Sequence, residues 1–165
     1  MIITIDGPVA SGKSSVAKAL AQKYGLYYLY TGLLYRGAAY LLAKRGIVNP
    51  ATLTERSRLY LHEADVACLS ELTYTYVNGK PAIIIDGQDV TTEIVQTSFD
   101  RCASLVSSSP VVREKLLSVQ RDIAKKQDII ADGRDCGTVV FPDADYKFYL
   151  TARGQERAQR LAVDP

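Results

Sequence analysis

The chain is poor in the side chains that most often carry nucleophilic or metal chemistry. Its 165 residues include one histidine, His62, and three widely spaced cysteines, Cys68, Cys102 and Cys136. A Ser-His or Cys-His mechanism needs a histidine beside the nucleophile, so a single histidine argues against one. The cysteines fit no zinc-binding spacing, and their odd number indicates free thiols in a reducing cytoplasm.

Signals for a membrane or a nucleic-acid surface are also absent from the sequence. No apolar run approaches the length of a membrane span, and Met1 leads straight into a short apolar strand without a signal-peptide pattern. The net charge is only +2, and 47% hydrophobic and 23% charged residues are ordinary for one soluble domain. We therefore expect a cytoplasmic protein that binds neither nucleic acid nor membrane. A monomer is expected.

The most informative stretch is a glycine-rich loop near the N-terminus. Residues 7–14 read G-P-V-A-S-G-K-S, between an apolar strand at 1–5 and a helix-patterned run from residue 16. This G-x-x-x-x-G-K-S pattern in strand–loop–helix context predicts a phosphate-binding P-loop. Gly7 and Gly12 allow the backbone N–H groups to curl around a phosphate. Lys13 would reach the β- and γ-phosphates, and the Ser14 hydroxyl would bind Mg²⁺.

The order of the remaining segments predicts an α/β fold with an insertion. Strands are expected at 27–30, 128–131 and 146–150, and helices at 33–44, from Thr52 or Thr54 to about residue 64, 99–106, 111–126 and 155–161. Residues 72–77 alternate apolar and polar, Asn78-Gly79 is a hairpin turn signal, and a second strand follows at 82–85. We predict a P-loop core at 1–62 and 98–165, with an antiparallel subdomain inserted at 63–97.

Charged residues at two predicted strand ends favour a small-molecule kinase. The chain has no Asn-Lys-x-Asp segment that would read guanine, and Arg36 and Arg134 follow the second and third predicted strands of the core. Arginine binds phosphate through bidentate, charge-assisted hydrogen bonds. A phosphate acceptor is largely ionised at pH 7, so its transfer reaction needs no general base. Asp132 ends a buried strand and is the expected carboxylate of the Mg²⁺ site.

Arg113 and Asp135 are candidates for reading a nucleobase. A carboxylate accepts a hydrogen bond from an exocyclic amine such as cytosine N4, and an arginine donates to ring nitrogen and carbonyl oxygen. Together they would prefer cytosine over uracil, whose carbonyl oxygen the carboxylate would repel. Taken alone, a charged residue on a helix is usually just solvated, and Arg113 would be read that way.

Three motifs closely resemble those of bacterial cytidylate kinases. They are I-D-G-P-x-x-S-G-K-S at 5–14, T-G-x-x-Y-R at 31–36 and A-D-G-R-D-C-G-T-V-V-F-P-D-A at 131–144. The resemblance runs from Met1 to about Leu161, and the third motif is its most specific part. It implies transfer of the ATP γ-phosphate to CMP or dCMP, in pyrimidine metabolism. It also implies the fold of the nucleoside monophosphate kinases, with a parallel sheet, helices on both faces and an NMP-binding insertion.

Roles follow from the resemblance position by position. Arg36 and Arg134 would hold the CMP phosphate, Thr31 and Tyr35 would line the acceptor site, and Ser104, Arg113 and Asp135 would read cytosine. Lys13, Arg36, Asp132 and Arg134 would carry catalysis, with Ser14 and Asp132 at the metal. The residues expected to contact ATP are Gly7, Pro8, Val9, Ala10, Ser11, Gly12, Lys13, Ser14, Ser15, Arg157 and Arg160.

The resemblance also shows where this chain departs from the family. After Leu161 the family continues into an arginine- and aspartate-rich lid and a final strand and helix, whereas this sequence stops at Pro165. We expect an open sheet edge with exposed apolar surface. If the chain is the whole molecule, turnover should be weak or absent, because a lid arginine can contribute roughly 10³-fold or more in rate.

Two alternatives to a CMP kinase stay open from the sequence. One is a P-loop kinase with another small acceptor, such as UMP or dephospho-coenzyme A. The other is a nucleotide-binding fragment without turnover. The Arg113–Asp135 pair speaks against the first, and a panel of acceptors separates the kinases. Tight CMP binding without ADP formation would support the fragment.

Overall fold

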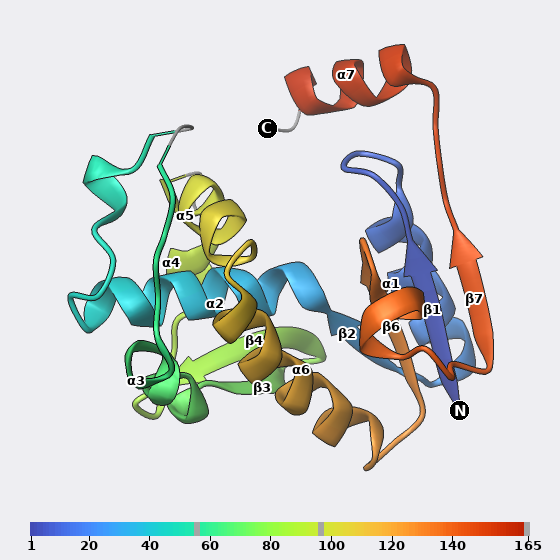
Figure 1. Cartoon of the computed structure of the whole chain (residues 1–165). Helices are drawn as coiled ribbons and strands as arrows, with labels where there is room; N and C mark the ends of the chain where they lie inside the picture. Colours follow the sequence, from blue (N-terminus) through green and yellow to red (C-terminus); the bar gives the residue numbers. More distant parts are fainter. Residues whose placement is uncertain (55–56, 96–97, 164–165) are drawn as a thin grey trace. The chain divides into compact units, whose positions relative to one another are not determined.

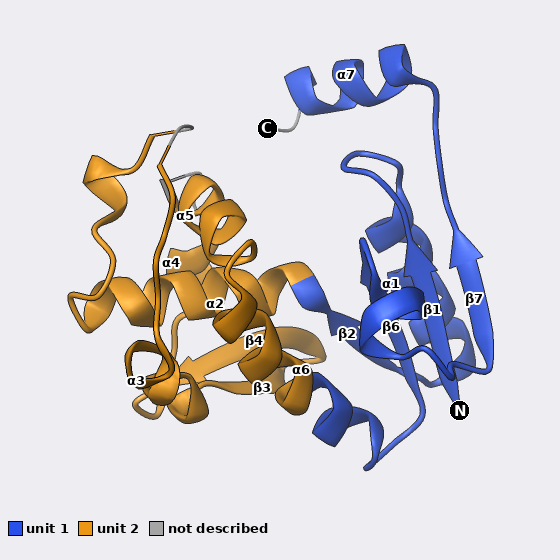
Figure 2. Ribbon diagram, in the orientation of Figure 1, with its two compact units in different colours: residues 1–31, 120–165 blue, residues 32–119 orange. Residues whose placement is uncertain are grey.

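The structure is a computed structural model of the 165-residue chain, and it describes residues 1–54, 57–95 and 98–163. The chain forms two compact units (Figure 2). The first combines residues 1–31 with residues 120 onward, and the second comprises residues 32–119. No helix in the described ranges is long and apolar enough to cross a membrane.

The first unit is built on a parallel β-sheet. Its strands are β1 (Ile2–Asp6), β2 (Tyr27–Tyr30), β6 (Ile129–Gly133) and β7 (Tyr146–Tyr149), in the spatial order β2-β6-β1-β7 (Figure 1). All pairings are parallel, with Ile3 opposite Ile130 on one side and Tyr146 on the other. Every residue of β6 is buried, as its unbroken apolar start requires. The carboxyl ends of β1 and β6 meet at one edge, where ligands of such sheets bind.

Helices and one unusual turn complete the first unit. Helix α1 (Lys13–Tyr24) follows the glycine-rich loop and ends at Gly25, and α7 (Gly154–Val163) is the last helix described. Residues Cys136–Val140 form a single π-helical turn that the sequence did not predict. At the β7 edge of the sheet, Tyr146, Phe148 and Tyr149 are 54%, 54% and 71% exposed.

The second unit combines helices with a small antiparallel sheet. Its strands are β3 (Thr73–Val77), β4 (Lys80–Ile85) and β5 (Gln88–Asp89), with Tyr74 opposite Ile83. Asn78 and Gly79 both have positive φ, 51° and 73°, which is the two-residue hairpin turn that their sequence predicts. Its helical segments are α2 (Thr31–Lys44), η1 (Pro50–Thr52), α3 (Glu63–Val66), η2 (Ala67–Glu71), α4 (Thr91–Ile94), α5 (Ser98–Val106) and most of α6 (Pro110–Ala124).

The core of the second unit forms where α2 meets the antiparallel sheet. A Cβ added at Gly37 of α2 would lie 2.9 Å from side-chain atoms of both Ile83 and Leu72, so the helix can approach the sheet because this residue has no side chain. Nearby helix and strand residues with exposed fractions of 2% or less supply the packing; they include Leu34, Leu41, Leu42, Leu69, Ile83, Ile85 and Ile94.

One predicted helix is wrong. The segment from Thr52 or Thr54 to residue 64 was expected to be helical, but residues 53–54 and 57–62 have no regular structure, and α3 begins only at Glu63. The backbone N–H of Thr54 donates to Ser57 Oγ at 2.9 Å, and Ser57 N–H donates back to Thr54 O at 3.1 Å. Thr54 and Ser57 therefore bind each other instead of starting a helix, and residues 57–62 then alternate between half-buried and exposed; residues 55–56 lie outside the described residues.

The predicted α/β architecture is confirmed: a parallel sheet accompanied by helices, plus a small antiparallel sheet. The predicted insertion, residues 63–97, falls inside the second unit, which begins earlier and ends later. Its role as a separate NMP-binding subdomain remains a prediction.

Candidate active site

The glycine-rich loop joins β1 to α1 with backbone angles that bring its amides to the start of the helix. Gly12 precedes α1 with φ 92°, and Ala10 also has a positive φ, 58°. Among the residues that the structure describes, no side chain caps the first turn of α1. A helix start without a side-chain cap presents N–H groups and the positive end of the helix dipole, which together favour an anion. Ser11 Oγ is buried in the loop without a hydrogen-bond partner among the described residues, so the loop contains a polar atom that a ligand can satisfy.

Lys13 is folded back over this loop. Its Nζ donates to the carbonyl oxygen of Pro8 at 3.2 Å. Partial burial lowers the pKa of Lys13, the charge of Asp132 opposes this shift, and the positive charge of Arg134 adds to it. The charges of Lys13 and Arg134 therefore lie close enough to influence each other beside the glycine-rich loop.

Asp132 links β6 to the glycine-rich loop. Ser14 Oγ donates to its Oδ2 at 2.6 Å, and the Tyr28 hydroxyl donates to its Oδ1 at 2.9 Å. Burial raises the pKa of the Asp132 carboxyl, while the hydrogen bonds from Ser14 and Tyr28 lower it. A hydroxyl and a carboxylate oxygen side by side are the hard oxygen donors that Mg²⁺ prefers, so this pair fits the predicted metal site.

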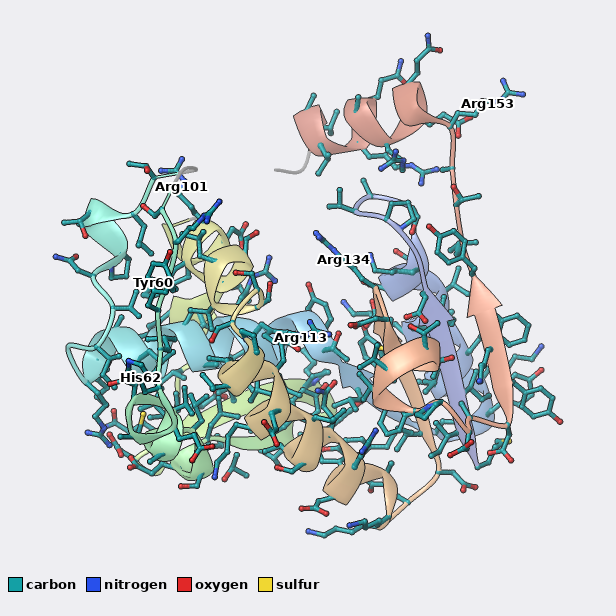
Figure 3. All side chains as sticks on the ribbon, viewed as in Figure 1. Tyr60, His62, Arg101, Arg113, Arg134 and Arg153 are labelled. Atoms are coloured by element: carbon teal, nitrogen blue, oxygen red, sulfur yellow. The ribbon has the colours of Figure 1, made fainter. Side chains whose placement is uncertain are left out.

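The residues after Asp132 lie at the end of β6. Arg134 is exposed and follows the last residue of the strand, where its side chain is seen in Figure 3, and Asp135 is half-buried. The Thr31 hydroxyl is buried and donates to the Asp132 carbonyl oxygen at 2.7 Å. Thr31, which directly follows β2, thus links the end of β2 to the end of β6 through this hydrogen bond.

Arg157 and Arg160 of α7 donate hydrogen bonds to backbone carbonyl oxygens of the glycine-rich loop. Arg157 Nη1 donates to Val9 O at 3.4 Å, and Arg160 Nη1 donates to Ala10 O at 2.9 Å. Both arginines predicted to approach ATP are therefore placed at the predicted phosphate loop.

In the second unit, predicted acceptor residues gather around α5. Arg36 of α2 forms an ion pair with Asp100 of α5, with Nε and Nη2 both 2.7 Å from Oδ1. Ser104 lies four residues after Asp100, on the same face of the helix. Arg113 of α6, labelled in Figure 3, donates to Ser107 O at 3.4 Å, at the C-terminal end of α5. Tyr35 precedes Arg36 on α2.

Comparison with known proteins decides the family. A family model described as cytidylate kinase matches residues 3–164. The chain belongs to the cytidylate kinase family. Among its curated relatives, the cytidylate kinase of Bdellovibrio bacteriovorus is 40% identical over 99% of this chain and 72% of that protein. The cytidylate kinase of Caldicellulosiruptor saccharolyticus is 39% identical over 98% of the chain and 68% of that protein.

Bifunctional relatives also match. The bifunctional pantoate ligase/cytidylate kinase of Prochlorococcus marinus is 43% identical over 99% of this chain. The chain spans 30% of the length of that bifunctional protein. Membership of the cytidylate kinase family confirms the resemblance inferred from the three motifs, and the third of these motifs includes the Asp132–Arg134–Asp135 segment that ends β6.

Three residues that contact this family's motif residues were not predicted. Tyr28 was expected only as part of the strand at 27–30, whereas its hydroxyl donates to Asp132 Oδ1. Asp100 was not identified as the partner of Arg36, and Asp6 was not identified as a ligand of backbone amides after β6. Along β2, Tyr28 and Leu29 are both buried and Tyr27 and Tyr30 are half-buried, so strand alternation gave no signal that would single out Tyr28.

Proposed function

We propose that the protein transfers the γ-phosphate of ATP to CMP or dCMP, giving ADP and CDP or dCDP, in pyrimidine nucleotide metabolism. The observation that carries the proposal is the link between the glycine-rich loop and β6, where Ser14 of the loop binds Asp132 of the family's most specific motif. Family membership supplies the acceptor, and the P-loop chemistry supplies the donor.

On the donor side, the loop amides and the start of α1 would bind the ATP phosphates. The contacting residues proposed are those of the sequence analysis, residues 7–15 with Arg157 and Arg160. Lys13 would leave the Pro8 carbonyl for the β- and γ-phosphates, since a phosphate oxygen is a stronger partner than a neutral carbonyl. Ser14 and Asp132 would hold Mg²⁺, which would neutralise phosphate charge during transfer.

On the acceptor side, Arg36 and Arg134 would hold the CMP phosphate. Ser104, Arg113 and Asp135 would read cytosine, and Thr31 and Tyr35 would line the site. The acceptor phosphate has a second pKa near 6, so it is ionised at neutral pH and acts as the nucleophile without a base. This suits a chain whose one histidine, His62, lies at the start of α3, where its backbone N–H donates to Asp65 Oδ2 at 2.8 Å.

The test is a coupled assay of ADP release with CMP, dCMP, UMP and AMP as acceptors. It is run on the 165-residue chain and on the full-length product of the gene. We expect the full-length form to phosphorylate CMP and dCMP far better than UMP or AMP. A clear preference for UMP would refute the cytosine assignment, and no turnover with CMP in the full-length form would refute the acceptor class.

The nucleotide-binding fragment is separated from the kinase by a binding measurement. Isothermal titration of the 165-residue chain with CMP and with Mg-ATP reports binding without turnover. Binding of both nucleotides without ADP formation in the 165-residue chain, together with turnover in a longer gene product, would show that these residues suffice for binding but not for turnover. Binding without turnover in both forms would support a nucleotide-binding protein instead.

A further inference from the structure

Asp6 uses its whole carboxylate to bind the backbone on the far side of the Arg134–Asp135 segment. Oδ1 accepts the N–H of Cys136 at 2.7 Å, and Oδ2 accepts the N–H of Gly137 at 2.8 Å. Asp6 is the last residue of β1, directly before the glycine-rich loop, and is only 7% exposed. A buried carboxylate that accepts two amide N–H bonds is a strong and directional anchor.

The Arg134–Asp135 segment is consequently fixed at both of its ends to the same point of β1. On the near side, Asp6 lies opposite Gly133 in the parallel register, and the N–H of Gly7 donates to Gly133 O at 3.2 Å. On the far side, the Asp6 carboxylate holds the two residues that follow Asp135. Two residues suspended between anchors on β1 have little freedom to shift relative to the glycine-rich loop.

The π-helical turn that begins at Cys136 makes the far anchor rigid. Val139 N–H donates to Asp135 O at 2.9 Å, and Phe141 N–H donates to Cys136 O at 2.7 Å. A Cβ on Gly137 would lie 2.6 Å from Thr4 Oγ1 and 3.3 Å from Asp6 Oδ2, so only glycine allows the turn to sit this close to β1. The glycine and the carboxylate thus form one device, which we call the Asp6 clamp (Asp6, Cys136, Gly137).

We propose that Asp6 is a positioning residue that fixes Arg134 and Asp135 relative to the glycine-rich loop, and that it thereby sets acceptor affinity and base selectivity. The inference rests on the proposed function, in which Arg134 holds the acceptor phosphate and Asp135 reads the base. It adds a residue that touches neither substrate. Through Asp6, the strand that carries the donor loop also fixes the backbone that bears Arg134 and Asp135.

Asp6→Asn is the direct test, because it keeps the size of the side chain but turns an NH₂ group toward one of the two N–H donors. We expect the KM for CMP to rise about tenfold, the change that loss of one charge-assisted hydrogen bond produces. The KM for ATP should change by less than about threefold, and the preference for CMP over UMP should fall. Asp145→Asn is the matched control: Asp145 Oδ2 accepts the N–H of Ile2 at 2.6 Å, at the opposite end of the same strand.

A second readout is independent of activity. Amide hydrogen exchange on the full-length protein should accelerate at residues 134–137 in Asp6→Asn, but not at β6 amides or in Asp145→Asn. Faster exchange with an unchanged KM for CMP would overturn the positioning role. Equal increases in the KM for CMP and ATP would also overturn it, because they indicate general loss of structure. If the wild type does not phosphorylate CMP, the proposed function fails, whereas the exchange result still reports on the clamp.

Gly137→Ala alters the turn residue of the Asp6 clamp instead of its carboxylate. It is the alternative test if Asp6→Asn does not fold. It should give the same rise in the KM for CMP, because its methyl group pushes the turn away from β1. Adding Thr4→Ala removes the nearest clashing atom, a buried hydroxyl with no hydrogen-bond partner in the described ranges, and should restore part of the affinity. No recovery in the double variant, or no change in the single variant, would contradict the proposal.

Discussion

Replacing Tyr28 by phenylalanine tests how the carboxylate of Asp132 is held. Tyr28 is 2% exposed, and its hydroxyl donates to Asp132 Oδ1 at 2.9 Å. A hydrogen bond to a charged group contributes about 1.5–3 kcal/mol, and a buried carboxylate that loses a donor retains the cost of its burial. We expect Tyr28→Phe to lower the free energy of unfolding by about 2 kcal/mol at neutral pH. For a chain of this size that corresponds to a fall in Tm of about 4–8 °C.

The same variant predicts a pH dependence with a definite sign. Burial raises the pKa of Asp132 above 3.8 in the folded protein, and the Tyr28 bond partly opposes this rise. The folded state therefore holds the Asp132 proton more tightly than the unfolded chain, so its contribution to stability falls as pH rises from 3.8 through the folded pKa. Tyr28→Phe raises that pKa further. The stability deficit of the variant should be largest at neutral pH and should shrink as acid protonates Asp132 in both proteins.

The assay is chemical denaturation of wild type and variant from neutral pH into the acid range, in EDTA so that no metal contributes. Tyr24→Phe is the control, because Tyr24 is 59% exposed and the substitution removes a solvent-exposed hydroxyl group. Its effect should be near zero at all pH values. A Tyr28→Phe deficit no larger than that of the control, or one that grows in acid, would refute the assigned hydrogen bond.

Three further predictions concern other parts of the chain. Asp100→Ala should raise the KM for CMP about two- to fivefold, because the half-exposed ion pair holds the rotamer of Arg36; an unchanged or lower KM would mean that Asp100 competes with the acceptor phosphate. Arg45→Met removes the exposed ion pairs at the end of α2 and should lower Tm by less than Tyr28→Phe does. The Tm difference between Arg45→Met and the wild type should disappear in high salt, which screens exposed ion pairs. Iodoacetamide followed by mass spectrometry at pH 8 should find Cys68 modified before Cys102, because burial raises the pKa of Cys102 to about 11 and leaves it 1% exposed; early modification of Cys102 would show that its part of the second unit opens.

Local patterns predicted most of the fold because each reports on residues close in sequence. The P-loop, the Asn78-Gly79 turn and the apolar strand at the start of β6 all have a mechanism that acts within a few residues. The helix expected before residue 64 was wrong for the same reason. Its start signal is real, but Thr54 and Ser57 hydrogen-bond to each other, and propensity alone does not extend a helix without packing.

Side-chain partners were less accessible from the sequence because they join distant positions. The Asp6 bond to Cys136 spans 130 residues, the Tyr28 bond to Asp132 spans 104, and the Arg36 bond to Asp100 spans 64. Each depends on strand order and helix placement, which periodicity does not give. The π-helical turn at Cys136 belongs to this class, since a carboxylate from β1 holds its first two N–H groups.

The way the carboxylates of the first unit are paired bears on phosphate binding. Asp6 accepts backbone amides, and Asp132 accepts the hydroxyls of Ser14 and Tyr28. Neither Lys13 nor Arg134 forms an ion pair within the part of the chain that the structure describes. Neutral donors therefore satisfy the carboxylates of Asp6 and Asp132, and the charges of Lys13 and Arg134 are not cancelled by a carboxylate in close contact. A phosphate that enters the loop can bind Lys13 and Arg134 without first breaking an ion pair between either of them and a carboxylate. This reduces the reorganisation that binding requires.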